Sequence, residues 1–356
     1  MSREQKSTRI VLTGGGTAGH VMPHLAILPA LKNQQVDVLY VGSKGIEQSL
    51  AQGNGIAFKK IAAGKLRRYV SVENFFDIFK VCFGFLQALV VLCRFRPKLV
   101  FSKGGYVGVP VAFAARVLGI PLVVHESDLT PGLANKLVLP FAKKILYSFP
   151  DSLRFLPKDK AIFTGSPIRA DLFLGSKAKG RQICQFSESE KKVLLIVGGS
   201  LGAEPLNKAV EAAFHSLTAR YLVCHVTGKG KKHIQNQQGY ASFEFVGEEL
   251  KHLVALADLV LCRGGANTLF EFLALNKPML IVPFEKGSRG DQIDNAKVFA
   301  ARGWGQMLFE KELTAESLLL ALANLEKEAP TILAKQKDVG YEKSSERVMA
   351  VLSSFW

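Results

Sequence analysis

A glycine-rich loop near the start of the chain restricts its fold more than any other stretch. The loop reads TGGGTAGHVMPH from Thr13 to His24, after the short apolar run Ile10–Leu12 and before apolar residues at helical spacing. The order strand, glycine loop, helix brings backbone N–H groups and a helix N-terminus to a phosphate or another polar ligand. The glycines fit GxGxxG, which alone is weak evidence because any tight turn without Cβ atoms needs glycines too. His20 adds a titratable base at the helix start, so this loop is the first candidate for a catalytic centre.

Strand and helix signals alternate along the first half of the chain. Short apolar runs predict strands at 36–41, 56–61, 99–102, 122–125, 145–148 and 161–164. Helical spacing appears at 75–93 and 109–118, and a second glycine turn, Gly104–Gly105, precedes the latter segment. This alternation favours an α/β fold with a doubly wound parallel sheet and ligands at the C-terminal ends of its strands.

The second half of the chain repeats this theme. GSPIRADLF at 165–173 interrupts the alternation and residues 174–191 are polar, which places a domain boundary near there. A strand at 193–197 then leads into a further glycine loop, GGSLGAEPLN at 198–207. Strands are also predicted at 221–227, 243–246, 259–262 and 279–282, helices at 267–275 and 292–301, and a helical tail from about 317 with a break near Pro330. Two related nucleotide-binding-type domains, facing each other, are expected.

Charge and composition indicate an acidic partner. The 356 residues are 48% hydrophobic and carry a formal charge of +16, and Lys59–Lys103 alone holds ten Lys or Arg against two acids. Within that segment lies the apolar run Val81–Cys93, shorter than the ~20 residues of a membrane-spanning helix. The run fits either a buried core helix or a helix resting on an anionic bilayer. The neighbouring GKLRRY at 64–69 and the phenylalanines Phe75, Phe76 and Phe79 favour the bilayer.

Missing motifs exclude several classes of protein. The five cysteines are scattered without a CxxC pair, which indicates a reducing compartment and no zinc site, and the polar N-terminal residues predict no signal peptide. The second predicted strand ends without the acid of an NAD-binding site, and no GxxxxGK[ST] or GxSxG motif occurs. Without a DxD pair, a metal-bound diphosphate is not expected, and backbone amides with basic side chains must neutralise it instead.

The densest candidate site of the second half is CRGGANTLFEFLALNKPMLIVPF at 262–284. Its glycines end a strand, and the helix that follows directs amides toward a phosphate. Glu271, about one turn inside, can accept two ribose hydroxyl hydrogen bonds or merely complement the helix dipole. Gln292 and Asn295, in GSRGDQIDNA at 287–296, share a helix face, which a surface helix start explains equally well. His125 and Glu126 at a strand end are more in keeping with a structural pair than with a metal site.

Eight motifs occur in the order typical of the MurG family of N-acetylglucosaminyltransferases, which the chain resembles along nearly its whole length. They are GGGTAGHVMP, YVGSKGIE, FSKGGYVGVP, HESDLTPGLANK, GSPIR, GGSLGAEPLN, CRGGANTLFE and DQIDNA. The resemblance implies the GT-B fold, with an acceptor and membrane-associating domain at 1–165 joined by a returning helix at about 335–356. It also implies a donor domain at 166–334 and inverting, metal-independent transfer of GlcNAc from UDP-GlcNAc to the C4 hydroxyl of lipid I, giving lipid II. No cofactor is implied.

The resemblance assigns roles to individual residues. His20 is the expected catalytic base, and the loops expected at the acceptor diphosphate contain Gly14, Gly15, Gly16, Gly104, Gly105 and Tyr106. The expected donor-binding residues are Thr17, Ala18, Gly19, Arg169, Ser200, Val246, Ala266, Asn267, Thr268, Leu269, Phe270, Glu271 and Gln292. Asp128 replaces the Asn of the family's usual HEQN and is carried over as a donor contact; Ala18 for Gly and Asp291 for His are milder departures.

The resemblance further implies a peripheral position on the cytoplasmic face of the inner membrane, with an anionic membrane surface and other cell-wall synthesis proteins as partners. The alternatives are a UDP-GlcNAc 2-epimerase, which shares the two-domain architecture, or another GT-B lipid glycosyltransferase. Nucleic acid is not an expected partner, because the chain lacks an RNP, KH or helix-turn-helix signature.

Overall fold

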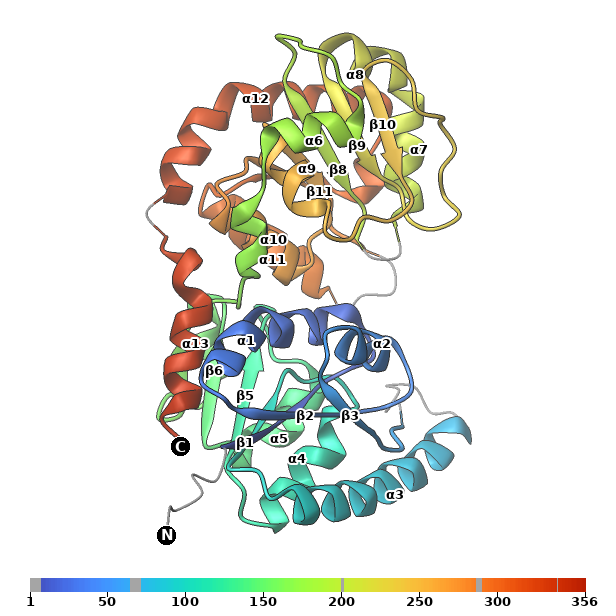
Figure 1. Ribbon diagram of the computed structural model, residues 1–356. Helices are drawn as coiled ribbons and strands as arrows, with labels where there is room; N and C mark the ends of the chain where they lie inside the picture. The colour runs from blue at the N-terminus through green and yellow to red at the C-terminus, as the bar shows by residue number, and fades with distance from the viewer. Residues whose placement is uncertain (1–7, 65–71, 200–201, 286–289, 338) are drawn as a thin grey trace. The chain divides into compact units, whose positions relative to one another are not determined.

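The computed structural model describes residues 8–64, 72–199, 202–285, 290–337 and 339–356. The chain divides into two compact units, Met1–Arg169 with Lys343–Trp356 and Ala170–Glu342 (Figure 1). Each unit is built on a single parallel sheet. The predicted α/β class is therefore confirmed for both halves of the chain.

The first unit contains a seven-stranded sheet in the order β3-β2-β1-β4-β5-β6-β7. Its strands are β1 Arg9–Thr13, β2 Asp37–Gly42, β3 Ala57–Lys60, β4 Leu99–Ser102, β5 Leu122–Glu126, β6 Lys144–Tyr147 and β7 Ala161–Phe163. Its α-helices are α1 Met22–Asn33, α2 Ile46–Gly53, α3 Val72–Phe95, α4 Gly108–Val117, α5 Leu133–Val138 and, from the chain end, α13 Ser344–Ser353. Short 3₁₀ turns follow at η1 Ala18–His20, η2 Leu139–Phe141 and η3 Pro150–Phe155.

Helices cover both faces of this sheet, so its central strands β1, β4 and β5 are almost entirely buried. Along β1, Ile10 and Leu12 face the core shared with α1 and α13, whereas Val11 faces the core shared with α3 and α4. Figure 1 shows α13 running beside α1. The last residues of the chain thus complete the core of the first unit.

The second unit contains a six-stranded sheet in the order β10-β9-β8-β11-β12-β13. Its strands are β8 Val193–Val197, β9 Leu222–Val226, β10 Tyr240–Phe243, β11 Leu259–Cys262, β12 Met279–Ile281 and β13 Gln306–Met307. Its α-helices are α6 Lys177–Cys184, α7 Glu204–Ala212, α8 Phe214–Arg220, α9 Leu250–Leu256, α10 Ala266–Ala274, α11 Asp291–Ala301 and α12 Ala315–Lys337. The 3₁₀ turns are η4 Ala170–Leu174, η5 Glu310–Glu312 and η6 Tyr341–Lys343. The polar stretch 174–191 includes α6, which packs on α9.

Two sequence predictions in this unit are wrong. The strand expected at 243–246 is β10, Tyr240–Phe243, because Tyr240 and Ala241 are the residues buried beside β9 and Val246 follows the strand. The break expected near Pro330 is absent, since α12 continues through it. Pro330 lies on the exposed side, where the carbonyl that loses its N–H partner can reach water, while Leu325, Ala329 and Ile332 hold the helix in the core.

In each sheet the strand order reverses at the first strand, between β1 and β4 and between β8 and β11. Ligands of open parallel sheets bind at such points, outside the C-terminal ends of the strands. The loops found there, after Thr13, Ser102, Val197 and Cys262, are the four glycine turns that the sequence singles out.

Gly105→Ala is expected to destabilise the first unit more than Gly119→Ala does. Both glycines have positive φ, +75° and +67°, which costs an alanine about 1 kcal/mol. A Cβ atom at Gly105 would also overlap the carbonyl oxygen of Gly15, whereas no atom lies within 4 Å of one at Gly119. Urea unfolding followed by circular dichroism should give Gly105→Ala a further loss of at least about 2 kcal/mol; equal losses would contradict the close approach.

Candidate active site

The loop after β1 is held from below by Glu47 and Tyr40. The buried Glu47 carboxylate accepts hydrogen bonds from the Ser43 N–H at 3.2 Å, the Ser43 hydroxyl at 2.5 Å and the Gly16 N–H at 3.4 Å. The Tyr40 hydroxyl donates to the Gly14 carbonyl at 2.8 Å, and burial raises the pKa of Tyr40 above its ordinary value. These contacts fix the glycine backbone at the end of the strand.

Tyr106 closes the other side of the crevice between β1 and β4. A Cβ atom at Gly16, where φ is +89°, would lie 2.6 Å from the Tyr106 ring, so the ring rests directly on the glycine backbone. Tyr106 is half-buried, and burial raises the pKa of its hydroxyl. The predicted loop residues from Gly14 to Gly16 and from Gly104 to Tyr106 are therefore brought together.

His20 lies at the end of η1 and remains partly exposed. Its Nδ1 is 2.9 Å from the Thr17 hydroxyl, which fixes the orientation of the ring. When Nδ1–H donates to Thr17 Oγ1, Nε2 presents its lone pair and can accept a proton. Thr17 and Gly19 are exposed in the same turn, whereas Ala18 is partly buried.

A second histidine, His24, lies one turn further along and is fully buried against Tyr40 and Phe101. Within the described residues neither of its ring nitrogens has a hydrogen-bond partner. Burial, reinforced by the charges of Lys103 and His20, lowers the pKa of His24 well below its ordinary value. The ring is therefore neutral at pH 7 and belongs to the floor of the crevice.

The His125–Glu126 pair makes structural hydrogen bonds. His125 Nε2 donates to the Gly165 carbonyl at 2.9 Å, and burial lowers its pKa well below the ordinary value. The Glu126 carboxylate accepts from the Asp128 N–H at 3.0 Å, the Gly132 N–H at 3.0 Å and Asn135 Nδ2 at 2.8 Å. Burial, helped by the charge of Asp128, raises the pKa of Glu126 to about 7. Asp128 itself is partly exposed at the turn after β5.

In the second unit, the N-terminus of α10 begins at Gly265, next to the end of β11. Asn267, Thr268 and Glu271 are partly exposed on this helix. Leu269 and Phe270 are fully buried, and the Phe270 ring stacks on Tyr341 with centroids 4.7 Å apart. Leu269 and Phe270 therefore belong to the core, and the Leu269 N–H is used at the Gly265 carbonyl, whereas the buried Ala266 has a first-turn amide to offer a ligand.

Gln292 and Asn295 join α11 to the neighbouring loops. Gln292 Oε1 accepts from the Phe284 N–H at 3.0 Å, and the buried Asn295 donates through Nδ2 to the Gly264 carbonyl at 3.1 Å. A Cβ atom at Gly264 would overlap the Gln292 carbonyl oxygen, so glycine is required there. Gln292 is thus placed beside the α10 N-terminus, and Asn295 is a structural residue.

Three buried polar residues connect the loops after β8 and β9. Asn207 of α7 donates through Nδ2 to the Thr227 carbonyl at 3.0 Å, and its Oδ1 accepts from His225 Nε2 at 3.0 Å. His225 Nδ1 lies 2.9 Å from the Tyr240 hydroxyl, and burial lowers the pKa of His225 to about 4. The network fixes the start of α7 behind the glycine loop.

The remaining predicted residues are scattered. Val246 lies on the loop after β10 and is partly exposed, and Arg169 is partly exposed at the last position of the first unit. Ser200 lies outside the described residues, as do Arg289 and all of GKLRRY except Gly64. No group of His, Cys, Asp and Glu residues that could hold a metal ion occurs within the described ranges.

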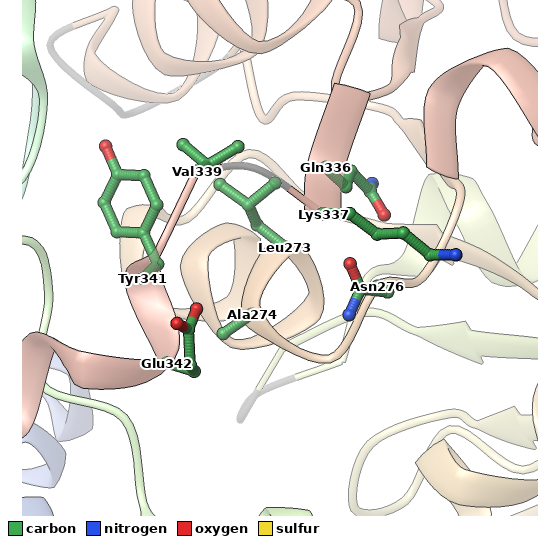
Figure 2. Close-up of a pocket in the computed structure, with 8 residues that line it drawn as sticks. All are labelled: Leu273, Ala274, Asn276, Gln336, Lys337, Val339, Tyr341 and Glu342. Carbon is green, nitrogen blue, oxygen red and sulfur yellow. The ribbon is translucent and has the colours of Figure 1, made fainter. Parts of the chain in front are cut away.

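A cavity of the second unit lies away from these loops, at the C-terminal end of α10. Its lining comes from α10, from the end of α12 and from the segment that follows, as Figure 2 shows: Leu273, Ala274, Asn276, Gln336, Lys337, Val339, Tyr341 and Glu342. Gln336 is buried there and donates to the carbonyls of Lys277 at 3.0 Å and Trp304 at 2.7 Å. None of the predicted site residues lines this cavity.

Comparison with known proteins decides the family. Residues 10–147 match the glycosyltransferase family 28 N-terminal domain and residues 193–350 its C-terminal domain. A protein of Staphylococcus aureus (strain MRSA252) is 48% identical over 95% of each chain, and one of Clostridium novyi (strain NT) is 43% identical over 98% of each. Both are named UDP-N-acetylglucosamine–N-acetylmuramyl-(pentapeptide) pyrophosphoryl-undecaprenol N-acetylglucosamine transferase. The chain belongs to the MurG family of glycosyltransferases.

Solved structures agree with this family in fold. Acinetobacter baumannii MurG matches with a TM-score of 0.75 at 23% identity, covering 98% of this chain and 99% of that chain. A UDP-GlcNAc 2-epimerase from Neisseria meningitidis, bound to UDP-GlcNAc, matches with a TM-score of 0.69 at 15% identity, over 98% and 100% of the two chains. At such identities the likeness shows the fold alone, so the GT-B class is confirmed and the epimerase shares it.

Three buried residues that support these loops escape the sequence reasoning: Glu47, Lys103 and Asn207. Glu47 begins α2 directly after a glycine turn, and Asn207 ends the motif GGSLGAEPLN, so both have a positional signal. In the sequence, Lys103 is recognisable only as one of the cations of a basic segment. In the structure it is buried, with 3% of the residue exposed. Its burial depends on the pairing of β4 with β1 and β5, which the sequence alone does not reveal.

Acid is expected to destabilise the second unit through His225. The pKa of His225 is about 4 in the fold and about 6.5 when unfolded, so between these pH values only the unfolded chain is protonated. Stability is therefore present above pH 6.5 and falls by about 3 kcal/mol as the pH drops to 4. Urea midpoints of His225→Gln should decline less steeply with falling pH than those of the exposed variant His215→Gln; equal slopes would contradict the assignment.

Proposed function

We propose that this protein transfers GlcNAc from UDP-GlcNAc to the C4 hydroxyl of the muramyl unit of lipid I, giving lipid II, with inversion and without a metal ion. The observation that carries the proposal is full-length membership of the MurG family combined with glycine loops at the switch point of each sheet. A nucleoside diphosphate sugar and a lipid diphosphate are both anions that such crevices recognise.

The donor is bound by the second unit. The amides at the start of α10, from Ala266 to Thr268, carry the positive end of the helix dipole and face the diphosphate. Glu271 accepts the ribose hydroxyls, and the backbone of Val246 contacts the uracil. Gln292 uses its Oε1 within the protein, so its amide N–H group is the part that meets a sugar hydroxyl. Arg169 contributes at the leaving group, and Ser200 and Asp128 are retained as further donor contacts.

The acceptor is bound by the first unit, and His20 is its general base. His20 Nε2 takes the proton of the C4 hydroxyl while that oxygen attacks the anomeric carbon, and the bond to UDP breaks on the opposite side. Nε2 acts in the tautomer in which Nδ1–H donates to the Thr17 hydroxyl, and Thr17 orients the ring through this contact. The charge that develops on the departing diphosphate is stabilised by helix N-terminal amides and Arg169.

The same unit rests on the membrane through α3 and α4. One side of α3 is in the core, with Ala88 and Leu92 buried, while Phe79, Phe83, Leu86 and Val90 are between 50% and 59% exposed at helical spacing. The neighbouring α4 adds the exposed Phe113 and Val117. Exposed cations flank these side chains: Lys80, Arg94, Arg96 and Arg116.

No helix of the described chain is long and apolar enough to cross a bilayer. An anionic surface at the cytoplasmic face of the inner membrane suits this pattern, and other cell-wall synthesis proteins are partners there.

UDP release that depends on a short-chain lipid I analogue and survives EDTA is the direct test. His20→Ala should lower turnover at saturating substrates by about 10²–10⁴-fold, the usual contribution of a general base. A loss under about tenfold would exclude His20 as the base. Conversion of UDP-GlcNAc without acceptor would instead indicate the epimerase.

Binding to vesicles of anionic phospholipid tests the membrane face. Phe83→Asp together with Leu86→Asp should weaken cosedimentation at least about tenfold, because two carboxylates replace apolar area and repel the surface. Leu320→Asp, at a side chain 65% exposed on α12 of the other unit, is the matched control and should bind normally. Equal binding of all three proteins would reject α3 as the contact.

A further inference from the structure

Lys103 occupies the floor of the crevice between β1 and β4. It directly follows β4, its N–H donates to the Thr13 carbonyl at 2.9 Å, and its side chain is buried, with 3% of the residue exposed. The glycine loop after β1 and the Gly104–Tyr106 turn lie on either side, and a Cβ atom at Gly14 would contact Lys103 Cβ at 3.3 Å. The cationic side chain is thus enclosed between the two loops.

The hydrogen-bond partners of the Lys103 ammonium are neutral. Nζ donates to His125 Nδ1 at 2.6 Å and to Ser127 Oγ at 2.6 Å. His125 must accept through Nδ1, because its Nε2–H is used at the Gly165 carbonyl. Among the residues that the structure describes, Lys103 forms no ion pair. An ammonium buried without a counter-ion is costly, so Lys103 tends to lose its proton unless an anion binds nearby and stabilises the charged form.

Two nearby carboxyl groups, those of Glu126 and Asp128, act on Lys103 through their charges. Glu126 is saturated by the three N–H donors described above, and Asp128 is partly exposed. The remaining titratable groups facing Lys103 are the rings of His24 and His125, whose pKa values are both lowered. Burial lowers the pKa of Lys103 to about 7, although the charges of Glu126 and Asp128 oppose the shift. An anion bound near Lys103 would raise the pKa of Lys103, because it would stabilise the charged ammonium.

The geometry points to Lys103 as a positioning residue for the acceptor. Its ammonium holds His125 and Ser127 in place, and its positive charge attracts the acceptor's diphosphate. This inference rests on the proposed function and deepens it, because it names the group that the acceptor's charge selects. A diphosphate diester is fully ionised at neutral pH, so its binding draws a proton onto Lys103. The donor, held by the other unit, does not depend on this charge.

The test compares Lys103→Met with Lys98→Met, which removes an exposed lysine just before β4. With a short-chain lipid I analogue, Lys103→Met should raise the KM for the acceptor at least about tenfold and change the KM for UDP-GlcNAc less than about twofold. The rise of the acceptor KM with pH, centred near 7 in the native protein, should disappear in this variant. Lys98→Met should match the native protein in its KM for the acceptor, in its KM for UDP-GlcNAc and in the rise of the acceptor KM with pH.

Calorimetry of analogue binding at pH 8, in buffers of different ionisation enthalpy, provides a measurement on the native protein that does not depend on the variant folding. Net uptake of up to about one proton is expected, because Lys103 with a pKa near 7 is then largely neutral before binding. Absence of uptake, or an acceptor KM of Lys103→Met within twofold of native, overturns the role of Lys103. Absence of any transfer by the native protein would instead reject the proposed function.

Discussion

Close backbone packing at the C-terminal ends of the strands determines the geometry of the loops in both units. In the first unit, Gly105 lies against the carbonyl of Gly15, and in the second, Gly264 lies against that of Gln292 and Gly202 against that of Thr227. Any side chain there would force the loops apart. The glycines therefore do more than permit turns, because they let neighbouring backbone segments come into contact at the ends of the strands.

The sequence predicts these points well because each has a local signal. An apolar strand followed by glycines and a helix is a pattern of adjacent residues, and β4, β8 and β11 begin and end where the sequence places them. Predictions fail where tertiary contacts decide. Tyr240 forms β10 because its ring packs on Phe214 and reaches His225, and the buried residues on both sides of Pro330 keep α12 continuous. The local sequence around Tyr240 or Pro330 predicts neither set of contacts.

The same distinction applies to α3. Its composition suits a core helix and a membrane-surface helix equally, because apolar residues occur on every side of it. The composition therefore does not tell which side packs in the core and which side is exposed. Only the packing separates them: Gly84 lies against the Ala62 carbonyl and Gln87 accepts the Ala62 N–H at 2.7 Å, which directs that side inward. The phenylalanines Phe79 and Phe83 are left exposed. Apolar surface of this kind on a helix of a folded unit indicates an interface.

Buried charge is where sequence reasoning is weakest, and it is also where the site acquires its chemistry. A lysine and a glutamate in the printed sequence look like surface residues, yet Lys103 and Glu126 lie under the loops with pKa values shifted toward neutrality by burial. Asp128, the last residue of HESD, adds a carboxylate whose charge acts on both of them. The Lys103 ammonium donates a hydrogen bond to Ser127, which directly precedes Asp128 in the chain. The cation and the carboxylate therefore lie close enough to influence each other's charge. A substitution at either position alters the charge that an anionic ligand meets, so the two are best understood together.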